Sequence, residues 1–513
     1  MKHFFLFITC VFSFTIVKAN NLVIGTPTYD HVEKTISFNI SWDNSWKITT
    51  GPANMDGVWV FVKRQACSNT NIWASAILST TSADHSSVAV SGSNLLTVDA
   101  VADGMGVYIR RTASGTGNIS AHTIKLKFNS TLNTNPSITT SLSDNFKVLG
   151  MEMVYVPQGG FYIGDGRPVN TSNFSNGDNV SSALYIDEAK QTAGLGDASV
   201  YTSNPIYGCP KRLPATFPLG YNGFWCMKYE ISTVSFVEFL NTLTYDQQAV
   251  RLSKWNPVRY PNGTSYFSGG GNQKIEIYVQ TVGTYNTIPA TFAYNVLEKY
   301  TPVGYLGWLD LTAFLDWSGL RPMTEFEFEK LCRGPLNPVA YEYPWGNTLI
   351  TKTNNNNSGN GSFSEKPSNV GEGLVLYAWE DLNWVPFRSG YAATATSTRS
   401  QAAATYYGIL DIAGNMAEQV VGGGSGYDYS NFTTTNGDGV LGANGNANVT
   451  GWPISYGISA GNFVKGGSFD NATTTTHLQV SDRTFYKYAS ATDNFSNGYY
   501  PAVGGRGIRS HTY

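Results

Sequence analysis

The chain has 513 residues, of which 33 are Lys or Arg and 36 are Asp or Glu, so charged residues make up only 13% of it, against roughly 25% in an average globular protein. A formal net charge of −3 gives no basic footprint for nucleic acid, and no run of about 18 apolar residues predicts a transmembrane segment. With 42% hydrophobic residues, the chain can build sizeable cores, and its length favours more than one domain.

The first residues have the pattern of a signal peptide. Met1, Lys2 and His3 form a short basic start, an apolar stretch follows to Val17, and Ala19 precedes a suitable cleavage point. We therefore predict that residues 1–19 are a signal peptide and that the protein is exported.

Residues 20–147 are predicted to form an antiparallel β-sandwich. Short segments in this part alternate apolar and polar residues or are briefly apolar, and Gly, Asn, Asp and Ser separate them. No helical period of useful length interrupts them, which favours a sandwich over a mixed fold. The expected strands are 34–42, 57–65, 71–78, 105–113 and 122–128.

Residues 148–513 show few regular elements and long loops rich in Gly and Asn. One helix is expected after a cap at Ser232 or Thr233, and a second over 306–319. A third should begin at Thr324, since Thr324 and Glu327 have the spacing of a capping box, and should end at Gly334.

Cysteines remain few once residues 1–19 are set aside: Cys67, Cys209, Cys226 and Cys332. No pair has the close spacing of a structural zinc site. Cys209 and Cys226 bracket a segment rich in Pro and Gly and could form a disulfide in an oxidising compartment. The alternative, that these cysteines are small buried hydrophobic residues, is equally compatible with the sequence.

Residues 148–513 contain seven collinear motifs. They are MVYVPQGGFYIGDG (153–166), FWCMKYEISTVSFVEFLN (224–241), LRPMTEFEFEKLCRGP (320–335), YPWGN (343–347), YGILDIAGNMAEQV (407–420), VKGGSF (464–469) and RGIRS (506–510). Together these motifs resemble the formylglycine-generating enzyme (sulfatase-modifying factor) family, and the resemblance is closest to members from Bacteroidota that carry an N-terminal β-domain. It implies an α+β fold class: the antiparallel β-sandwich followed by an irregular C-type-lectin-like, formylglycine-generating-enzyme-like domain.

The segment DIAGNMAE is the best candidate for a metal site. Asp411 and Glu418 offer hard anionic oxygens, and a turn at Gly414 can present its own carbonyl and that of Met416, which is a ligand mixture suited to Ca²⁺. Two acids seven residues apart more often lie on a solvated face, but the resemblance implies a structural calcium site at these four residues. It also implies a second calcium site within Asn354–Asn357 or soon after, where four consecutive Asn prevent a choice.

The family's copper-dependent oxidases use two cysteines just after the Gly-Gly-Ser motif, as soft ligands for Cu(I). The matching positions here are at or near Asn471 and Thr476, and no cysteine follows Cys332. We therefore expect no copper, no catalytic residues and no formylglycine-generating activity. His477, the one histidine near this region, is interpreted as a structural residue.

Intact fold motifs without the catalytic thiols predict a noncatalytic, calcium-binding scaffold or interaction protein of the cell envelope. Its expected place is the periplasm or cell surface of a Gram-negative bacterium, and its expected partner is another envelope or surface protein. By analogy with relatives, that partner could belong to the gliding motility or type IX secretion machinery. Two alternatives stay open: an enzyme with altered chemistry at the family cleft, and a glycan-binding module using aromatic residues such as Trp452, Tyr456, Tyr486 and Tyr488.

Overall fold

The structure is a computed structural model of the whole chain. The residues that it describes are 21–66, 72–129, 131, 144–167, 175–176, 182–195, 200–201, 213–251, 277–281, 288–294, 299–354, 364–377, 386–394, 396–422, 427–457, 460–470, 474–484 and 502–510.

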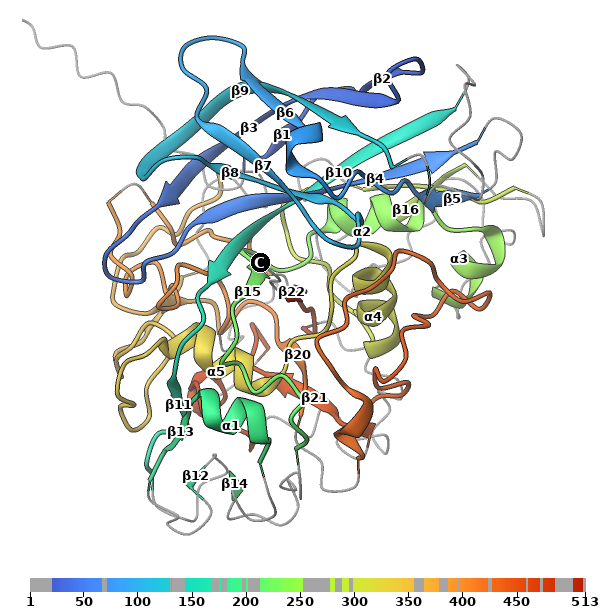
Figure 1. The fold of residues 1–513 in the computed structure, drawn as a ribbon. Coiled ribbons are helices and arrows are strands. Elements are labelled where there is room, and N and C mark those ends of the chain that lie inside the picture. Colours follow the sequence, from blue (N-terminus) through green and yellow to red (C-terminus); the bar gives the residue numbers. More distant parts are fainter. Residues whose placement is uncertain are drawn as a thin grey trace, which may run out of the picture.

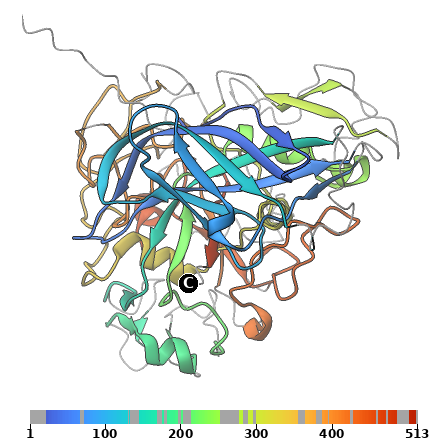
Figure 2. The same ribbon diagram turned by 45° about the horizontal axis from the view of Figure 1, so that its top comes forward.

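Two antiparallel sheets form the N-terminal part, as the alternating pattern predicts (Figure 1). The strands of the outer sheet are β1 (Val23–Ile24), β2 (Thr28–Asp30), β3 (Thr35–Lys47), β6 (Ser86–Ala89) and β9 (Gly115–Lys127). The inner sheet lies beneath it in the turned view (Figure 2), with strands β4 (Asp56–Gln65), β5 (Trp73–Ser75), β7 (Leu96–Ala100), β8 (Val107–Arg111), β10 (Asn145–Val156), β15 (Phe224–Met227) and β22 (Ile508–Ser510).

A core of aliphatic and aromatic side chains fills the space between these two sheets. Ile36, Phe38 and Ile40 point into it from β3, and Val58 and Val60 point into it from β4. Alternate residues of a strand face opposite sides of a sheet, so each strand contributes every second residue to this core. The predicted antiparallel β-rich N-terminal part is confirmed.

Strand β10 joins the two parts of the molecule. Residues Asn145 to Val154 pair with β4, and Met153 to Val156 pair with β15, which in turn pairs with β22 near the end of the chain. The predicted domain boundary at residue 147 therefore falls inside one strand, and the inner sheet continues from the N-terminal part into the C-terminal part.

The C-terminal part contains short helices and small two-stranded sheets between long loops. The helices are α1 (Glu188–Ala193), α2 (Thr233–Leu240), α3 (Tyr245–Arg251), α4 (Trp308–Trp317) and α5 (Glu325–Arg333), with single 3₁₀ turns η1 (Ser82–Asp84), η4 (Tyr429–Asn431) and η6 (Thr476–Leu478). The paired strands are β11 (Phe161–Ile163) with β13 (Leu184–Ile186), β12 (Ser175–Asn176) with β14 (Val200–Tyr201), β16 (Ile277–Thr281) with β17 (Thr291–Tyr294), β18 (Thr351–Lys352) with β19 (Leu374–Val375), and β20 (Glu418–Val421) with β21 (Asn462–Lys465).

The three predicted helices are present, and the two for which caps were predicted have them. Ser232 caps α2 through its side chain, which accepts a hydrogen bond from Ser235 N. Thr324 and Glu327 form both bonds of a capping box at the start of α5, and Gly334 caps its end. Within the described residues, every helix is too short or too polar to span a bilayer.

Polar contacts lock the inner sheet to the C-terminal part. Trp59 Nε1 donates to Ser318 O at 2.9 Å, and Lys63 Nζ donates to Trp317 O at 2.6 Å, both at the end of α4. Asn54 Nδ2 donates to Tyr407 O at 2.8 Å on the other side. Each of these donors would be costly to bury without its acceptor, so the two parts are held in one arrangement.

Candidate functional site

The DIAGNMAE loop turns sharply just before β20, because three of its residues have left-handed backbone conformations. Asp411 has φ of 53°, Gly414 of 75° and Asn415 of 55°. At Gly414 a side chain is also excluded by space, since a Cβ atom there would lie 2.8 Å from Leu376 O. The turn places both predicted acids of the loop in the protein interior.

Asp411 and Glu418 lie in one buried cluster with two residues from distant parts of the chain, Glu230 and Arg506. Exposed fractions are 4% for Asp411, 2% for Glu230 and 0% for both Glu418 and Arg506. Arg506 Nε donates to Glu418 Oε1 at 2.7 Å, and Arg506 Nη2 donates to the carbonyl of Asp411 at 3.3 Å. The guanidinium thus pairs directly with one carboxylate and ties down the backbone beside another.

Glu230 supports the same loop from the turn before α2. Its Oε1 accepts a hydrogen bond from Met416 N at 3.2 Å, and its Oε2 accepts bonds from Ser389 Oγ at 2.7 Å and Asn415 Nδ2 at 3.2 Å. All three donors are neutral groups. Burial, reinforced by the neighbouring Asp411 carboxylate, raises the pKa of Glu230 well above its usual range.

The pKa values of the two loop acids are also raised, and burial is the main cause for each. For Asp411 the Gly390 N–H group and Arg506 oppose the rise, and for Glu418 Arg506 opposes it. Of these three buried carboxylates, only that of Glu418 pairs directly with the guanidinium of Arg506. Electrostatically, a bound cation would favour the ionised form of all three.

The donor set of this loop fits calcium. Glu418 Oε2 is buried without a hydrogen-bond partner, and no hydrogen bond to the buried carbonyl of Gly414 or of Met416 occurs among the described residues. Calcium prefers such a mixture of carboxylate and carbonyl oxygens. No group of three or more His, Cys, Asp or Glu side chains suited to a metal occurs in the described part of the chain, so backbone carbonyls would have to complete this site.

All four residues predicted from the sequence, Asp411, Gly414, Met416 and Glu418, thus lie in one buried loop. Sequence reasoning missed Glu230 and Arg506, although Glu230 stands in the motif FWCMKYEISTVSFVEFLN and Arg506 in RGIRS. A charged residue in a short motif carries no local sign of burial, so nothing in either motif alone could reveal the pairing.

The second predicted calcium site is largely outside the described residues, which include Asn354 and exclude Asn355–Asn357. Asn354 Oδ1 accepts a hydrogen bond from Ser368 Oγ at 2.6 Å, and its backbone N–H donates to Asn369 Oδ1 at 3.1 Å. These contacts hold Asn354 against residues 368–369.

The segment in which the family's oxidases place their cysteines begins at a tight glycine turn. Gly466 has φ of 82°, and a Cβ atom there would collide with the carbonyl of Ile412. Ser468 follows, fully buried, with an Oγ atom that has no hydrogen-bond partner. Asn471 lies outside the described residues, and Thr476 starts η6 with its Oγ1 bonded to Thr474 Oγ1 at 3.0 Å.

His477 forms a small polar cluster with Asp482 and Thr484. Its Nδ1 lies 3.3 Å from Asp482 Oδ2 and 3.0 Å from Thr484 Oγ1, and Thr484 Oγ1 also donates to Asp482 Oδ2 at 2.8 Å. Asp470, which follows the Gly-Gly-Ser turn, has its pKa raised to about 6 by burial. The His477 contacts agree with the interpretation of this residue as structural.

Cys226 and Cys332 are free thiols and both are completely buried. Burial raises the pKa of Cys226 to about 12 and that of Cys332 well above the usual range. For these two residues the structure agrees with the alternative of small buried hydrophobic side chains. Cys209, the predicted disulfide partner of Cys226, lies outside the described residues, as does Cys67.

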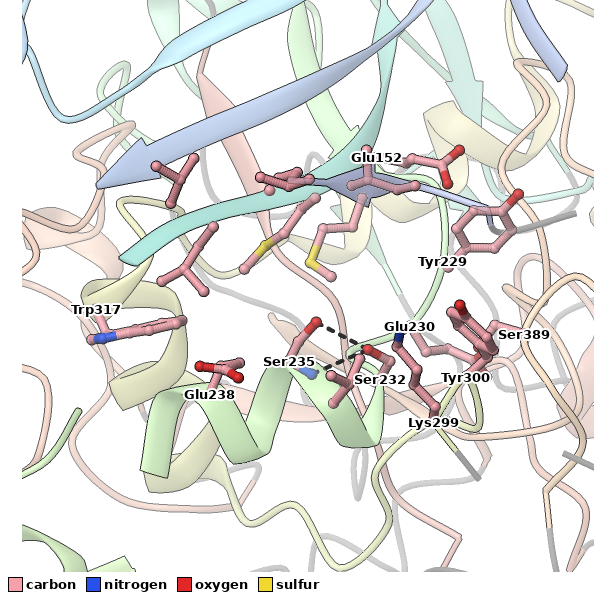
Figure 3. Close-up of a pocket in the computed structure, with 18 residues that line it drawn as sticks. Glu152, Tyr229, Glu230, Ser232, Ser235, Glu238, Lys299, Tyr300, Trp317 and Ser389 are labelled. Atoms are coloured by element: carbon pink, nitrogen blue, oxygen red, sulfur yellow. Dashed lines mark hydrogen bonds between the residues drawn. The ribbon is translucent and has the colours of Figure 1, made fainter. Parts of the chain in front are cut away.

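A pocket of about 250 Å³ lies where the N-terminal strands meet α2 (Figure 3). Its walls combine apolar residues of β1 and β10 with Ser232, Ser235 and Glu238 of the α2 segment. Glu230 and Ser389 line one end, so the pocket reaches the residues that support the DIAGNMAE loop. None of the described residues 466–470 and 474–484 lines it, and Asn471 lies outside the described residues.

Of the aromatic residues considered for glycan binding, Trp452 is only 4% exposed and Tyr456 is partly buried. Tyr486 and Tyr488 lie outside the described residues. The buried Trp452 packs in the main core, so it cannot serve as a surface platform for a sugar.

Comparison with known proteins identifies one family. The profile of the Sulfatase-modifying factor enzyme 1-like domain family matches residues 140–495. The formylglycine-generating enzymes of Mus musculus and Bos taurus are each 28% identical over 144 residues, which is 26% of this chain and 36% and 35% of those proteins. The chain therefore matches only about a third of the length of these relatives.

Solved structures give weaker likenesses. The Major Tropism Determinant P3c variant covers 83% of both chains with a TM-score of 0.23 and 12% identity. The group B streptococcus pilus 2b backbone protein covers 41% of this chain and 83% of its own, with a TM-score of 0.13 and 11% identity. Neither value supports an inference about fold or function.

Proposed function

Because the chain belongs to the family of Sulfatase-modifying factor enzyme 1-like domains, we propose that it is a noncatalytic member, a calcium-stabilised scaffold or interaction protein of the bacterial cell envelope. The observation that carries this proposal is the identity of two positions after Gly466-Gly467-Ser468, which are Asn471 and Thr476. Amide and hydroxyl oxygens are hard ligands and do not hold Cu(I) as thiolates do.

No other cysteine can take over this role from the described part of the chain. Cys226 and Cys332 are enclosed in the core that contains β15 and α5, and their raised pKa values keep them as thiols. A thiol that is neither exposed nor ionised neither binds copper nor attacks a substrate. The two remaining cysteines precede all seven family motifs or lie between the first and second.

Calcium has a structural role in the proposal. Asp411, Gly414, Met416 and Glu418 would hold the ion, which would supply positive charge to a cluster rich in buried carboxylates. Glu230 orients the loop by accepting the N–H bond of Met416, and Arg506 fixes the side chain of Glu418. The C-type-lectin-like description of the C-terminal part belongs to the same proposal, since irregular loops of this length are usually stabilised by ions or function in binding.

Export and location follow from the signal-peptide pattern of residues 1–19. The proposed setting is the periplasm or surface of a Gram-negative cell, with an envelope protein as partner, such as a component of gliding motility or type IX secretion. The fusion of the two parts through β10 supports a scaffold role, because it offers a partner one rigid surface.

Incubation with copper, oxygen and a cysteine-containing sulfatase-type peptide tests the noncatalytic assignment. We expect the peptide cysteine to stay unmodified by mass spectrometry, while a family member with both cysteines oxidises it in parallel. Oxidation of the peptide by this protein would overturn the assignment. Affinity purification from the native envelope tests the scaffold role: a defined complex supports it, and recovery of the protein alone, under conditions that preserve known envelope complexes, contradicts it.

A further inference from the structure

A second cavity, of about 410 Å³, shares no lining residue with the DIAGNMAE loop. It is enclosed by the end of β10, the turn 218–223, the start of α5 and the end of β22. Most of its lining side chains are polar: Arg321, Glu327, Gln158, Gln191, Asn222 and Thr434.

An ion pair between Arg321 and Glu327 forms the floor of this cavity. Nη2 lies 2.5 Å from Oε1 and Nη1 lies 3.0 Å from Oε2, which is a bidentate geometry. Arg321 Nε also donates to Ser510 Oγ at 2.7 Å, and Glu327 Oε2 accepts from Thr324 N at 2.9 Å. Both side chains are 2% exposed and held from several directions, so the floor is preorganised.

The pair still has hydrogen-bonding capacity toward the cavity that it lines. A guanidinium has five N–H donors; among the described residues, one hydrogen bond is formed by Arg321 Nη2 and one is accepted by Glu327 Oε1. One N–H and one carboxylate lone pair therefore remain side by side. Two separate hydroxyl groups can satisfy them, one by accepting from the N–H and one by donating to the carboxylate oxygen.

Gln191 repeats this arrangement on another wall. Its Nε2 donates to Phe217 O at 3.0 Å and its Oε1 accepts from Leu219 N at 3.0 Å. These two bonds fix the amide and leave one N–H and one lone pair. Since Gln191 is only 9% exposed, these remaining groups are available mainly to a molecule inside the cavity.

The rim adds three exposed side chains, Gln158, Asn222 and Thr434. None of them forms a side-chain hydrogen bond with the described residues. The backbone at Asn222 is nevertheless fixed, because Lys330 Nζ donates to its carbonyl at 3.3 Å and to that of Tyr221 at 2.9 Å. The rim therefore presents two amides and a hydroxyl to the solvent side of the cavity.

We propose that this cavity binds a neutral saccharide ring, with sugar hydroxyls bonded to Arg321 and Glu327 at the floor, to Gln191 on the wall and to the rim residues above. A phosphate or sulfate ion is disfavoured because Glu327 already neutralises the guanidinium. An apolar molecule is disfavoured because it would leave the buried floor groups without partners. The cavity volume is sufficient for one sugar ring with water or for two rings.

This proposal does not depend on the noncatalytic assignment, and its test is binding alone. Saturation-transfer NMR with free glucose, galactose, mannose and N-acetylglucosamine detects a free-sugar ligand, and an array of neutral oligosaccharides detects the end of a glycan chain. We expect saturable binding in at least one of the two experiments. Binding should be lost for deoxy analogues of the same sugar, because a site built for hydroxyl groups rejects a ligand that lacks one.

Substitutions at the rim test whether the sugar binds in this cavity. N222A and T434A should each weaken binding by about tenfold, as expected for one lost hydrogen bond, and Q158W should block it. Asn337 is an exposed Asn that lines neither pocket, and N337A should leave binding unchanged. Failure of every neutral sugar to bind, equal binding by the rim variants and N337A, or displacement of the sugar by inorganic phosphate would each overturn the proposal.

Discussion

Glu418 and Arg506 are both completely buried, and their closest approach, from Nη2 to Oε1, is 2.6 Å. The pair joins the first residue of β20 to the segment before β22. Arg506 also donates to the carbonyl of Asp411 and lies near Glu230. Burial raises the pKa of all three carboxyl groups, and the positive charge of Arg506 opposes this rise and favours their ionised forms.

Removal of Arg506 should therefore destabilise the protein strongly. We expect R506M to lower the free energy of unfolding by about 3–5 kcal/mol, the usual cost of leaving one member of a buried ion pair alone. The measurement is urea unfolding. K190M is the matched control, since the Lys190–Asp187 pair is about one-third exposed and should contribute less than about 1 kcal/mol.

The double variant E418Q/R506M, compared with the two single variants, separates the contribution of the Glu418–Arg506 ion pair to stability from the other contributions of Arg506. If Glu418 is its main partner, the double variant should lose clearly less than the sum of the single variants. Additive losses would show that the Glu418 pairing contributes little.

Calcium should raise the thermal stability of the protein, because an ion that binds only the folded state stabilises it by mass action. Chelation with EGTA should lower Tm, and added calcium should restore it. D411N should remove most of this response. D246N, at an exposed position in α3, should respond like the unmodified protein. A Tm that is the same with EGTA and with calcium would rule out a stabilising site.

Lys63 predicts a dependence of stability on pH. Burial lowers its pKa to about 7 in the folded protein, from an ordinary value of 10.5. Between these values the unfolded chain binds the proton and the folded protein does not, so the free energy of unfolding should rise with pH. The effect is on the order of several kcal/mol in total.

K63M should flatten this part of the pH profile, measured by urea unfolding at pH values between 7 and 10. K190M, at a partly exposed position, should leave the profile unchanged. Burial also lowers the pKa of Lys330 to about 7, so some slope should persist in K63M. A profile as steep in K63M as in the unmodified protein would contradict the role of Lys63.

The two described cysteines should be unreactive until the protein unfolds. In a C67S/C209S variant lacking residues 1–19, a thiol reagent at neutral pH should label Cys226 and Cys332 slowly in buffer and rapidly in urea, because burial hinders both access and thiolate formation. A variant with the added substitution S93C, at an exposed position, provides the control for a reactive thiol. Rapid labelling in buffer without S93C would contradict the burial.

Local features of the fold could be predicted from the sequence. The start of α5 is an example, because a capping box depends on Thr324 and Glu327, three residues apart, and the structure has both of its bonds. The strand at 57–65 was also predictable, but the burial of both its faces was not. Val58 and Val60 face the core between the two sheets, whereas Trp59 and Phe61 pack in the core shared with the C-terminal part, so β4 is buried along almost its whole length.

The arrangement around Asp411 shows where prediction from one sequence ends. Its position in a turn followed from Gly414, but the approach of Glu230 and Arg506 depends on pairing between β10, β15 and β22. Hydrogen bonds between distant strands leave no periodic pattern in the sequence. The same is true of the second cavity, where Gln191 lies close to a distant segment that holds both Arg321 and Glu327.

The ten residues of β10 that pair with β4 have a consequence for how the chain unfolds. A force that pulls the N-terminal part away along β10 loads these backbone pairs together, in shear, rather than one after another. A cut at residue 147 would instead leave most of β10 on the C-terminal fragment with one edge unpaired, and such an edge recruits other chains. The two parts should therefore lose their structure in one cooperative transition and be difficult to isolate from each other in soluble form.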